Sequence, residues 1–475
     1  MTGMRLVILA IFVSLSLAAC AAGPSFVRPN QDGGEWHTAG ADTGEIEAAW
    51  WKGFKDSLLD GLIDEAVANN HDIRIAKANV REARALRTDA RSGFFPEIGV
   101  SGQRERTVRS KDSAAGSRGS TDYDASLDVS WELDIFGKTR RGSESAMAAL
   151  RAEEETQRGI VLSVISETAA SYFEARGLQR RIALLKTNIG LLKKTEDIAQ
   201  SRFKNGVVSE LDVLRARGER EELEATLPAL EAGMMAAVFR VSVLTGNRPE
   251  HHVEAMMKAK TFSLPRDRVP VGLRSDVLRR RPDVRAAERN LAKSSADIGA
   301  AEADLFPSLS LTGSVSSGTA RFADLLSGGS IAFAAGQLID WAIFSGWQRT
   351  AAVEAAKARN EASFALYEKT VLTALEEAER QLVAYGKAWS RLKQLRTAEK
   401  SRQESHRIAR LRYESGTEDF LSMVDAERSV ISIQDNVVES ETAVLLRLTD
   451  LYRALGGGWE AHENRPIKLP QKKTK

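Results

Sequence analysis

The stretch YDASLDVSWELD, residues 123–134, alternates between apolar and polar side chains without a fault. The apolar positions are Tyr123, Ala125, Leu127, Val129, Trp131 and Leu133, and the positions between them are Asp, Ser or Glu. A period of two is typical of a β-strand with one apolar and one polar face. Segments of about ten residues with this pattern occur in transmembrane β-barrels. The stretch therefore predicts a strand that faces lipid on one side and carries acids on the other.

Three weaker stretches predict further strands of the same kind. Residues 308–317 also alternate, residues 97–109 have Arg104 and Arg106 on the apolar face, and residues 330–341 are the fourth candidate. Four strands leave two open sheet edges, which lipid does not tolerate, and spanning barrels begin at about eight strands. We therefore expect the chain to supply a share of a larger barrel, with about eight strands in a dimer or about twelve in a trimer. Two hairpins packed on helices in a soluble body are the alternative.

Long segments without proline predict helices on either side of these strands. Residues 138–204 and 348–414 are rich in Ala, Leu, Glu, Arg and Lys, which favour helix. A helix of this length would extend about 100 Å. A further helix is predicted over residues 57–92, because Phe95 and Pro96 end it. On these helices alone, a plain antiparallel coiled coil would be the better interpretation.

The chain repeats itself at a period of about 210 residues. The stretches RFKNGVVSELDVLRA (202–216) and RYESGTEDFLSMVDA (412–426) share their aromatic, glycine, leucine and alanine positions at an offset of 412 − 202 = 210. DIRIAKANVREARALRTDARSGFFP (72–96) matches DVRAAERNLAKSSADIGAAEADLFP (283–307) at an offset of 211. So long a period indicates duplication of a whole unit. Each unit is predicted to contain one helix, two strands and two long helices joined by a glycine-containing turn.

The N-terminus predicts export and a lipid anchor. Arg5 precedes an apolar run from Leu6 to Leu17, which suits a signal peptide and is too short to span a bilayer. The only cysteine, Cys20, follows in a setting that resembles the lipobox of bacterial lipoproteins, whose cysteine is lipidated after cleavage. Ala21 comes next, and lipoproteins without Asp there usually go to the outer membrane. Acyl chains would anchor the chain on the periplasmic side; an incidental cysteine is the alternative.

The composition argues against several classes of function. Lys plus Arg (67) nearly balance Asp plus Glu (65), so no basic surface for nucleic acid is expected. The six histidines show no HExxH or other ligand spacing, and His251 and His252 lie in a polar connector. No phosphate loop follows a strand and no nucleophile elbow is found. We expect no catalytic activity, no metal site and no cofactor.

The sequence resembles the outer-membrane factor family, the TolC-like channels, and within it the lipoprotein branch of NodT type. The stretches that carry the resemblance cover the mature chain from end to end: WELDIFGKTRR (131–141), VSVLTG (241–246), VPVGLRSDVLRRRPDVRAAERNL (269–291), LFPSLSLTGS (305–314) and ALGGGW (454–459). The resemblance implies a homotrimer whose twelve-stranded barrel in the outer membrane continues into an α-helical barrel across the periplasm. It also implies a passive exit duct that works with a periplasmic adaptor and an inner-membrane transporter.

In that family the turns between the long helices form the periplasmic end of the tunnel. The resemblance therefore implies adaptor docking near Gly206, Ser209, Leu211 and Gly416. Glycine at these turns can take the positive φ that ends and reverses a helix. The alternative is that these residues are only helix caps.

The resemblance also implies a gate at Leu421 and Asp425. They are four residues apart and share a helix face, so three copies would form an apolar ring and an acidic ring. Ser422 stands where some family members have a second acid, so a double acidic ring is not implied. The alternative is a packed leucine and a solvated aspartate.

These observations favour an outer-membrane channel that carries small molecules such as drugs from a resistance-nodulation-division transporter. Metal efflux and type I secretion are alternatives within the channel class. A lipid-anchored periplasmic coiled-coil scaffold is the rival of another class, but a scaffold has no need of the lipid-facing stripe at residues 123–134. The predicted organisation is a signal peptide (1–19), a lipidated extended segment (20–56), a first repeat (57–264), a second repeat (265–455) and a C-terminal tail (456–475).

Overall fold

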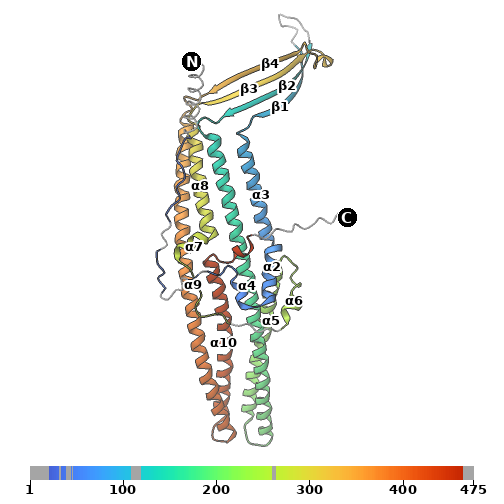
Figure 1. The fold of residues 1–475 in the computed structure, drawn as a ribbon. Helices are drawn as coiled ribbons and strands as arrows, with labels where there is room; N and C mark the ends of the chain where they lie inside the picture. Colours follow the sequence, from blue (N-terminus) through green and yellow to red (C-terminus); the bar gives the residue numbers. More distant parts are fainter. Residues whose placement is uncertain are drawn as a thin grey trace. The chain divides into compact units, whose positions relative to one another are not determined.

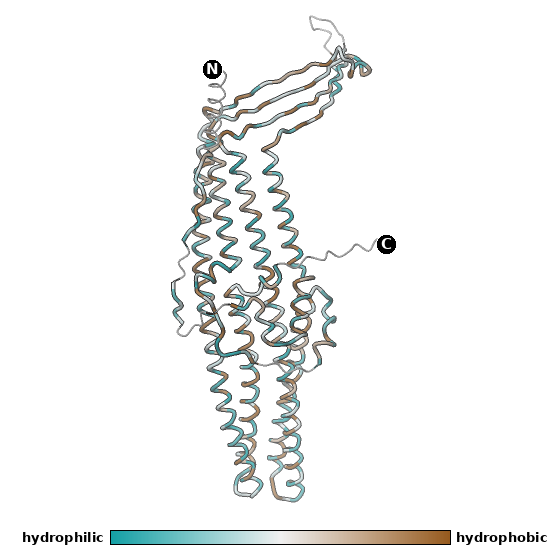
Figure 2. The backbone as a smooth tube through the Cα atoms, viewed as in Figure 1, coloured by the Kyte–Doolittle hydropathy of each residue, from teal (hydrophilic) through white to brown (hydrophobic). Residues whose placement is uncertain are grey.

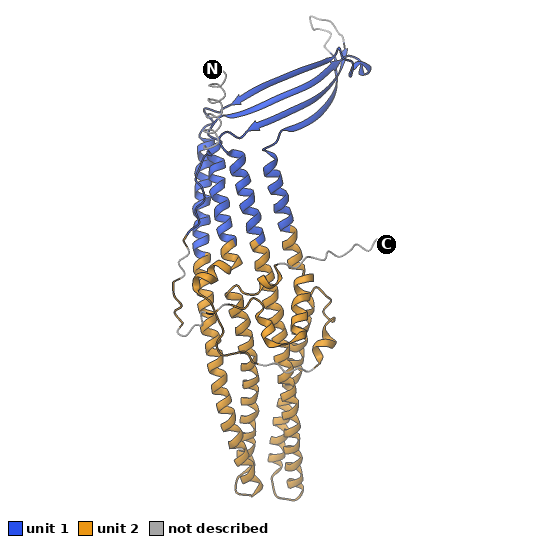
Figure 3. Ribbon diagram, in the orientation of Figure 1, with its two compact units in different colours: residues 1–29, 79–154, 286–369 blue, residues 30–78, 155–285, 370–475 orange. Residues whose placement is uncertain are grey.

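The computed structural model describes residues 21–30, 34–38, 44, 46–108, 119–258 and 264–463. Cys20, the predicted lipid attachment site, lies outside these residues. The chain forms two compact units, each assembled from separate stretches of sequence (Figure 3). Unit 1 takes residues 1–29, 79–154 and 286–369, and unit 2 takes residues 30–78, 155–285 and 370–475. Each unit therefore draws on both copies of the duplicated sequence.

Unit 1 contains a four-stranded antiparallel sheet in the order β1-β2-β3-β4 (Figure 1). The strands are β1 (Glu97–Val108), β2 (Gly119–Leu133), β3 (Ser308–Thr319) and β4 (Ile331–Asp340), close to the predicted stretches. Leu127 of β2 lies opposite Val100 on one side and Val315 on the other. Directly opposed residues share a face, so the apolar stripe of β2 continues onto both neighbouring strands. Within the described chain, β1 and β4 each have only one partner strand.

The apolar face of the sheet is open in the single chain. Apolar and polar residues alternate along the strands (Figure 2), and Val100 and Phe333 remain 82% and 78% exposed. Further exposed aromatic residues follow β4 where the chain returns to helix, namely Trp341, Phe344 and Trp347. An apolar band bordered by aromatic side chains is typical of a barrel surface in lipid.

Helices of matching length occupy equivalent positions in the two copies of the repeated sequence. Helices α3 (His71–Ser92) and α8 (Pro282–Ala303) have 22 residues each. Helices α4 (Lys138–Lys204) and α9 (Gln348–Glu414) have 67 residues each, and they begin and end where the sequence predicted. Helices α5 (Glu210–Leu244) and α10 (Phe420–Ala454) have 35 residues each. The short helices are α2 (Ser57–Asn69), α6 (Val253–Met257), α7 (Arg274–Arg280), η1 (Trp50–Phe54), η2 (Phe322–Asp324) and η3 (Trp459–His462).

The single helix predicted over residues 57–92 is wrong, because the chain breaks into α2 and α3 at Asn70. Asn70 has an extended ψ of 137°, and its side-chain oxygen accepts from the N–H groups of Asp72 (2.8 Å) and Ile73 (3.2 Å). This is the capping arrangement that begins a new helix. Its amide nitrogen donates to the carbonyl of Leu244 at the end of α5, 2.9 Å away. This tertiary contact thus fixes a helix break that the local sequence pattern does not predict.

The core of unit 2 lies inside its helical bundle, around η1 and the C-terminal parts of α5 and α10. Trp50 stacks on Tyr452 with ring centroids 5.0 Å apart, and Phe54 packs against Phe173 at 4.9 Å. By length and composition α5 is the one helix in the described part of the chain that could cross a membrane. However, Val238 and Val241 of α5 are buried in this same core. We therefore interpret α5 as a helix of the bundle.

Two of the stretches that resemble the family, residues 269–291 and 454–459, come together at Arg281. Its buried guanidinium donates to the carbonyl of Ala454 at the end of α10 (2.7 Å) and to the carboxylate of Glu377 (2.8 Å). Gly456 has a φ of +72°, and a Cβ at this position would lie 3.0 Å from Arg281 Cγ. Arg281 therefore has the same role in the second copy as Asn70 has in the first. Arg281 binds the last carbonyl of α10, and Asn70 binds the last carbonyl of α5.

We predict that Arg281→Met lowers the free energy of unfolding by about 2 kcal/mol, because hydrogen bonds to a charged group are lost and Ala454 loses its buried donor. Thermal unfolding of the purified protein in detergent measures the effect. Arg380→Met is the matched control, because Arg380 pairs with Glu376 on the exposed side of α9 and should contribute within about 0.5 kcal/mol. Equal losses in the two variants would contradict the role given to Arg281.

Candidate functional site

The turns after α4 and α9 have the same backbone construction. Gly206 has a φ of +71°, its N–H donates to the Phe203 carbonyl (2.9 Å), and the Val207 N–H donates to the Arg202 carbonyl (2.9 Å). At Gly416, with a φ of +76°, the equivalent bonds measure 3.1 and 3.0 Å. This pair of bonds is the Schellman arrangement, in which glycine ends a helix. The positive φ expected from the sequence is confirmed at both turns.

A capping residue begins the next helix after each turn. Ser209 and Asp212 form a reciprocal capping box at the start of α5. Asp419 accepts from the Ser422 N–H (2.8 Å) at the start of α10. The pKa of Asp419 is lowered by hydrogen bonds from Ser422 and, to a lesser degree, by the nearby charge of Arg215. Ser209, predicted to contact a partner, thus has a structural role in this chain as well.

The two turns lie at the same end of unit 2 (Figure 1) and share one small apolar cluster, which we call the tip cluster. Its members come from all four long helices: Ala199, Val213, Ala216, Tyr413, Phe420, Met423 and Val424. Arg202 lies over the ring of Tyr413, with its Cζ atom 4.4 Å from the centroid. Neither Arg202 nor Tyr413 was predicted from the sequence as a functional residue. The sequence does show an aromatic residue at this position in both copies, Phe203 and Tyr413, and this repetition was the one sign that the position matters. Of the two, only Tyr413 is buried.

The predicted gate residues point away from the tip cluster on a different side of α10. Leu421 is 42% exposed and Asp425 is exposed, whereas Met423 and Val424 are buried. Among the described residues, Asp425 has no ion-pair partner. The equivalent position in α5, Arg215, pairs with Asp212 at 3.7 Å. The structure therefore leaves an apolar and an acidic side chain open on one helix face, as the sequence predicted, and their role in a gate stays a prediction.

Exposed apolar side chains surround the first turn. Val207 is 67% exposed and Leu211 is 53% exposed, and Leu214 follows on the same helix at 52%. In the second turn Thr417 takes the position of Val207. The two turns therefore share a backbone but differ in the surface they present.

A groove with a volume of about 500 Å³ lies between α4, α5 and α10. Its walls include Leu184, Leu192 and Leu230, which are apolar. Ion pairs cross between the helices along it, including a bidentate pair from Arg181 to Asp435 (2.8 and 2.7 Å). Such a groove can accept apolar side chains between fixed charges. The groove could not be predicted from the sequence, because it depends on which three helices pack against one another.

The chain next to the predicted lipid site lies beside the end of β2 in unit 1. The Ala22 N–H donates to the Phe136 carbonyl (3.0 Å), and Arg141 of α4 donates to the carbonyls of Ala22 and Gly23, each at 3.0 Å. Phe136 follows β2 and precedes α4. The first described residues after Cys20 are therefore held at the strand-to-helix junction.

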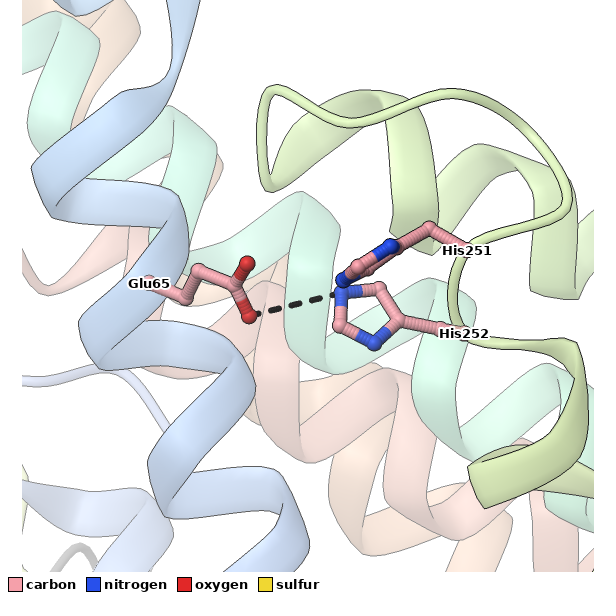
Figure 4. Close-up of side chains that lie close together, drawn as sticks. All are labelled: Glu65, His251 and His252. Carbon is pink, nitrogen blue, oxygen red and sulfur yellow. Dashed lines mark ion pairs between the residues drawn. The ribbon is translucent and has the colours of Figure 1, made fainter.

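One group of titratable residues was not expected from the sequence. Glu65 of α2 lies beside His251 and His252, which precede α6 (Figure 4). His252 is buried, and burial lowers its pKa, although Glu65 opposes this shift. The spacing of the histidines alone could not reveal the group, because Glu65 comes from a distant part of the sequence.

Comparisons with known proteins agree with this architecture. Residues 62–247 and 273–457 match the model of a family described as outer membrane efflux protein. Nodulation protein T of Rhizobium leguminosarum bv. trifolii is 31% identical, with 94% of this chain and 96% of that protein covered. The antibiotic efflux pump outer membrane protein ArpC of Pseudomonas putida is 30% identical, with 91% of each covered. The solved outer-membrane channel OprN is 34% identical with a TM-score of 0.87, covering 93% of this chain and 100% of that one.

We predict that Gly206→Ala and Gly416→Ala each destabilise the tip by about 1 kcal/mol, because a Cβ disfavours the positive φ at these turns. Neither position has a neighbouring atom within 4 Å of an added Cβ, so strain and not collision would be the cause. Thermal unfolding and limited proteolysis at the turns measure the effect. Gly218→Ala is the control: Gly218 lies inside α5 with equally open surroundings, and alanine there should be neutral or stabilising. Destabilisation by Gly218→Ala of the same size would remove the argument from φ.

Proposed function

This chain belongs to the outer membrane efflux protein family, and on that premise we propose that three copies form the exit duct of a tripartite efflux pump. The observation that carries the proposal is the four-stranded sheet with an apolar face and two open edges. Three such sheets joined edge to edge give a barrel of about twelve strands. With strands about 4.8 Å apart and tilted by about 40°, the backbone diameter is about 24 Å, wide enough for a pore.

The polar face of the sheet supports conduction through the inside of this barrel. Asp124 and Asp128 of β2 lie on the face opposite the apolar stripe, and Gln103 and Gly99 of β1 are their direct neighbours. Barrel strands that face lipid on one side turn their other side to the lumen. An acidic lumen favours cations and admits water, which suits a passive duct.

The tip of unit 2 is the proposed meeting point with a periplasmic adaptor. Val207 and Leu211 are exposed beside Gly206, and the groove between α4, α5 and α10 lies in the same unit. Exposed apolar side chains close to a fixed turn are suited to contact another protein. We propose that the adaptor docks near both turns, at Gly206, Ser209, Leu211 and Gly416, and links the duct to an inner-membrane transporter.

We propose small apolar or amphipathic molecules, including drugs, as the cargo. The relative named as an antibiotic efflux pump component supports this choice. A wide passive duct leaves selection of the cargo to the transporter that feeds it. The chain itself requires no catalytic group for this function.

The assembly is tested with the purified protein in detergent and in planar bilayers. We expect light scattering to give three times the chain mass and the bilayers to show discrete conductance steps. A monomer without conductance would contradict the proposal and would favour the periplasmic scaffold.

We predict that Asp425→Asn reduces the preference of the channel for cations by about twofold or more, because three carboxylates at one level attract cations. The ratio of potassium to chloride permeability, taken from the reversal potential in a salt gradient, measures it. Glu439→Gln makes the same charge change at an exposed site further along α10 and should leave the ratio unchanged. If Asp425→Asn leaves the ratio unchanged, Asp425 is not at the gate.

We propose that Cys20 carries the lipid anchor, and Cys20→Ser should abolish labelling by radioactive palmitate. The position of Ala22 beside Phe136 supports this site, because the acyl chains would emerge next to the strand ends. A lipid anchor adds to the hold of a barrel already in the membrane, so assembled channels should persist in Cys20→Ser. Palmitate incorporation into Cys20→Ser equal to that of the unchanged protein would place the lipid elsewhere.

A further inference from the structure

Glu65, His251 and His252 bring one possible ligand atom each to within 4.8 Å of one another. Glu65 lies on α2, and the two histidines lie in the connector between α5 and α6 (Figure 4). His252 Nε2 is 3.4 Å from Glu65 Oε2. The two imidazole rings stand nearly perpendicular, with their centroids 4.7 Å apart. All three residues belong to unit 2.

We propose that these three side chains bind one divalent transition-metal ion, with zinc as the best match. Two imidazole nitrogens and one carboxylate oxygen form a donor set that zinc uses in proteins. In a tetrahedral site with bonds of about 2.0 to 2.1 Å, neighbouring ligand atoms lie about 3.4 Å apart. The pair formed by Glu65 and His252 already has this spacing. His251 is exposed, so its ring can turn to close the remaining distance and a water can complete the site.

The residues around the cluster hold it in an orientation that suits a cation. The Asn247 side-chain amide donates to Glu65 Oε1 at 2.7 Å, which leaves Oε2 directed at His252. Thr245 Oγ1 donates to the Ser242 carbonyl (2.8 Å) and lies 3.0 Å from His252 Nε2. The hydroxyl therefore offers Nε2 a lone pair, and a metal ion at Nε2 would replace a proton there. A metal ion at Nε2 would also replace the contact with Thr245, whereas Asn247, which binds the other oxygen of Glu65, is a neighbour of the kind that orients a ligand and contributes to metal affinity.

A bound ion would join α2 to the connector after α5. The chain just beyond this connector is held at the end of α6, because Arg176 of α4 donates to the carbonyls of Met256 (3.0 Å) and Lys258 (2.7 Å). The metal would thus add to the hydrogen bonds from Thr245 and Asn247 that already hold the connector. This role is separate from conduction and does not depend on the proposed cargo.

The test measures zinc binding to the full chain, purified in detergent without a histidine tag. Isothermal titration with zinc chloride should give one ion per chain. His251→Ala and Glu65→Gln should each weaken binding by about tenfold or more. His71→Ala is the control, because His71 is an exposed histidine on α3 outside the cluster. Magnesium and calcium should not compete, because these ions prefer oxygen ligands.

Cobalt(II) provides a second measurement that does not rely on heat. Its visible absorption should appear in the unchanged protein and in His71→Ala and be lost in His251→Ala, whose exposed side chain can be removed without disturbing the core. Zinc that binds His251→Ala as tightly as the unchanged protein would show adventitious binding and overturn the site. The absence of any zinc binding to the folded trimer would overturn it as well, and neither result would affect the conductance tests.

Discussion

A strand edge in lipid leaves backbone N–H and C=O groups without partners, and each such group costs several kcal/mol. In the described chain β1 and β4 each present one edge of this kind. Other copies of the chain can satisfy both edges at once, because β4 of one copy can pair with β1 of the next. In the proposed trimer this constraint requires a closed barrel, and closure then places one face of every strand against lipid and the other toward the lumen.

Much of this architecture could be predicted from the sequence because its signals are local. The alternation at residues 123–134 depends only on neighbouring side chains, and α4 and α9 are marked by their helix-favouring composition and by the glycine that follows each of them. The break at Asn70 could not be predicted in the same way, since the carbonyl that holds its side chain lies 174 residues away. The same reason explains why the stacking of Arg202 on Tyr413, the groove and the position of Glu65 were missed. The periodicity of a local segment does not show which helices pack against one another.

The two copies illustrate how a duplicated unit can keep its backbone and change its surface. Gly206 and Gly416 make the same pair of backbone bonds, and Gly246 and Gly456 close the following helices with positive φ as well. The side chains near the tip differ: Tyr413 is buried where Phe203 is exposed. Glycine positions are fixed by backbone geometry, whereas neighbouring side chains are free to differ between the two turns.

The equal lengths of α4 and α9 have a consequence for the ways in which such a chain can change. Each residue added to a helix advances it by about 1.5 Å and rotates it by about 100°. One residue removed from α9 alone would turn Tyr413 away from Arg202 and withdraw it from the tip cluster. A deletion of about seven residues, close to two turns, comes within about 20° of restoring the rotation, and it would have to occur in both copies for the two glycine turns to remain level. The length of the duct can therefore change only if α4 and α9 gain or lose the same number of residues.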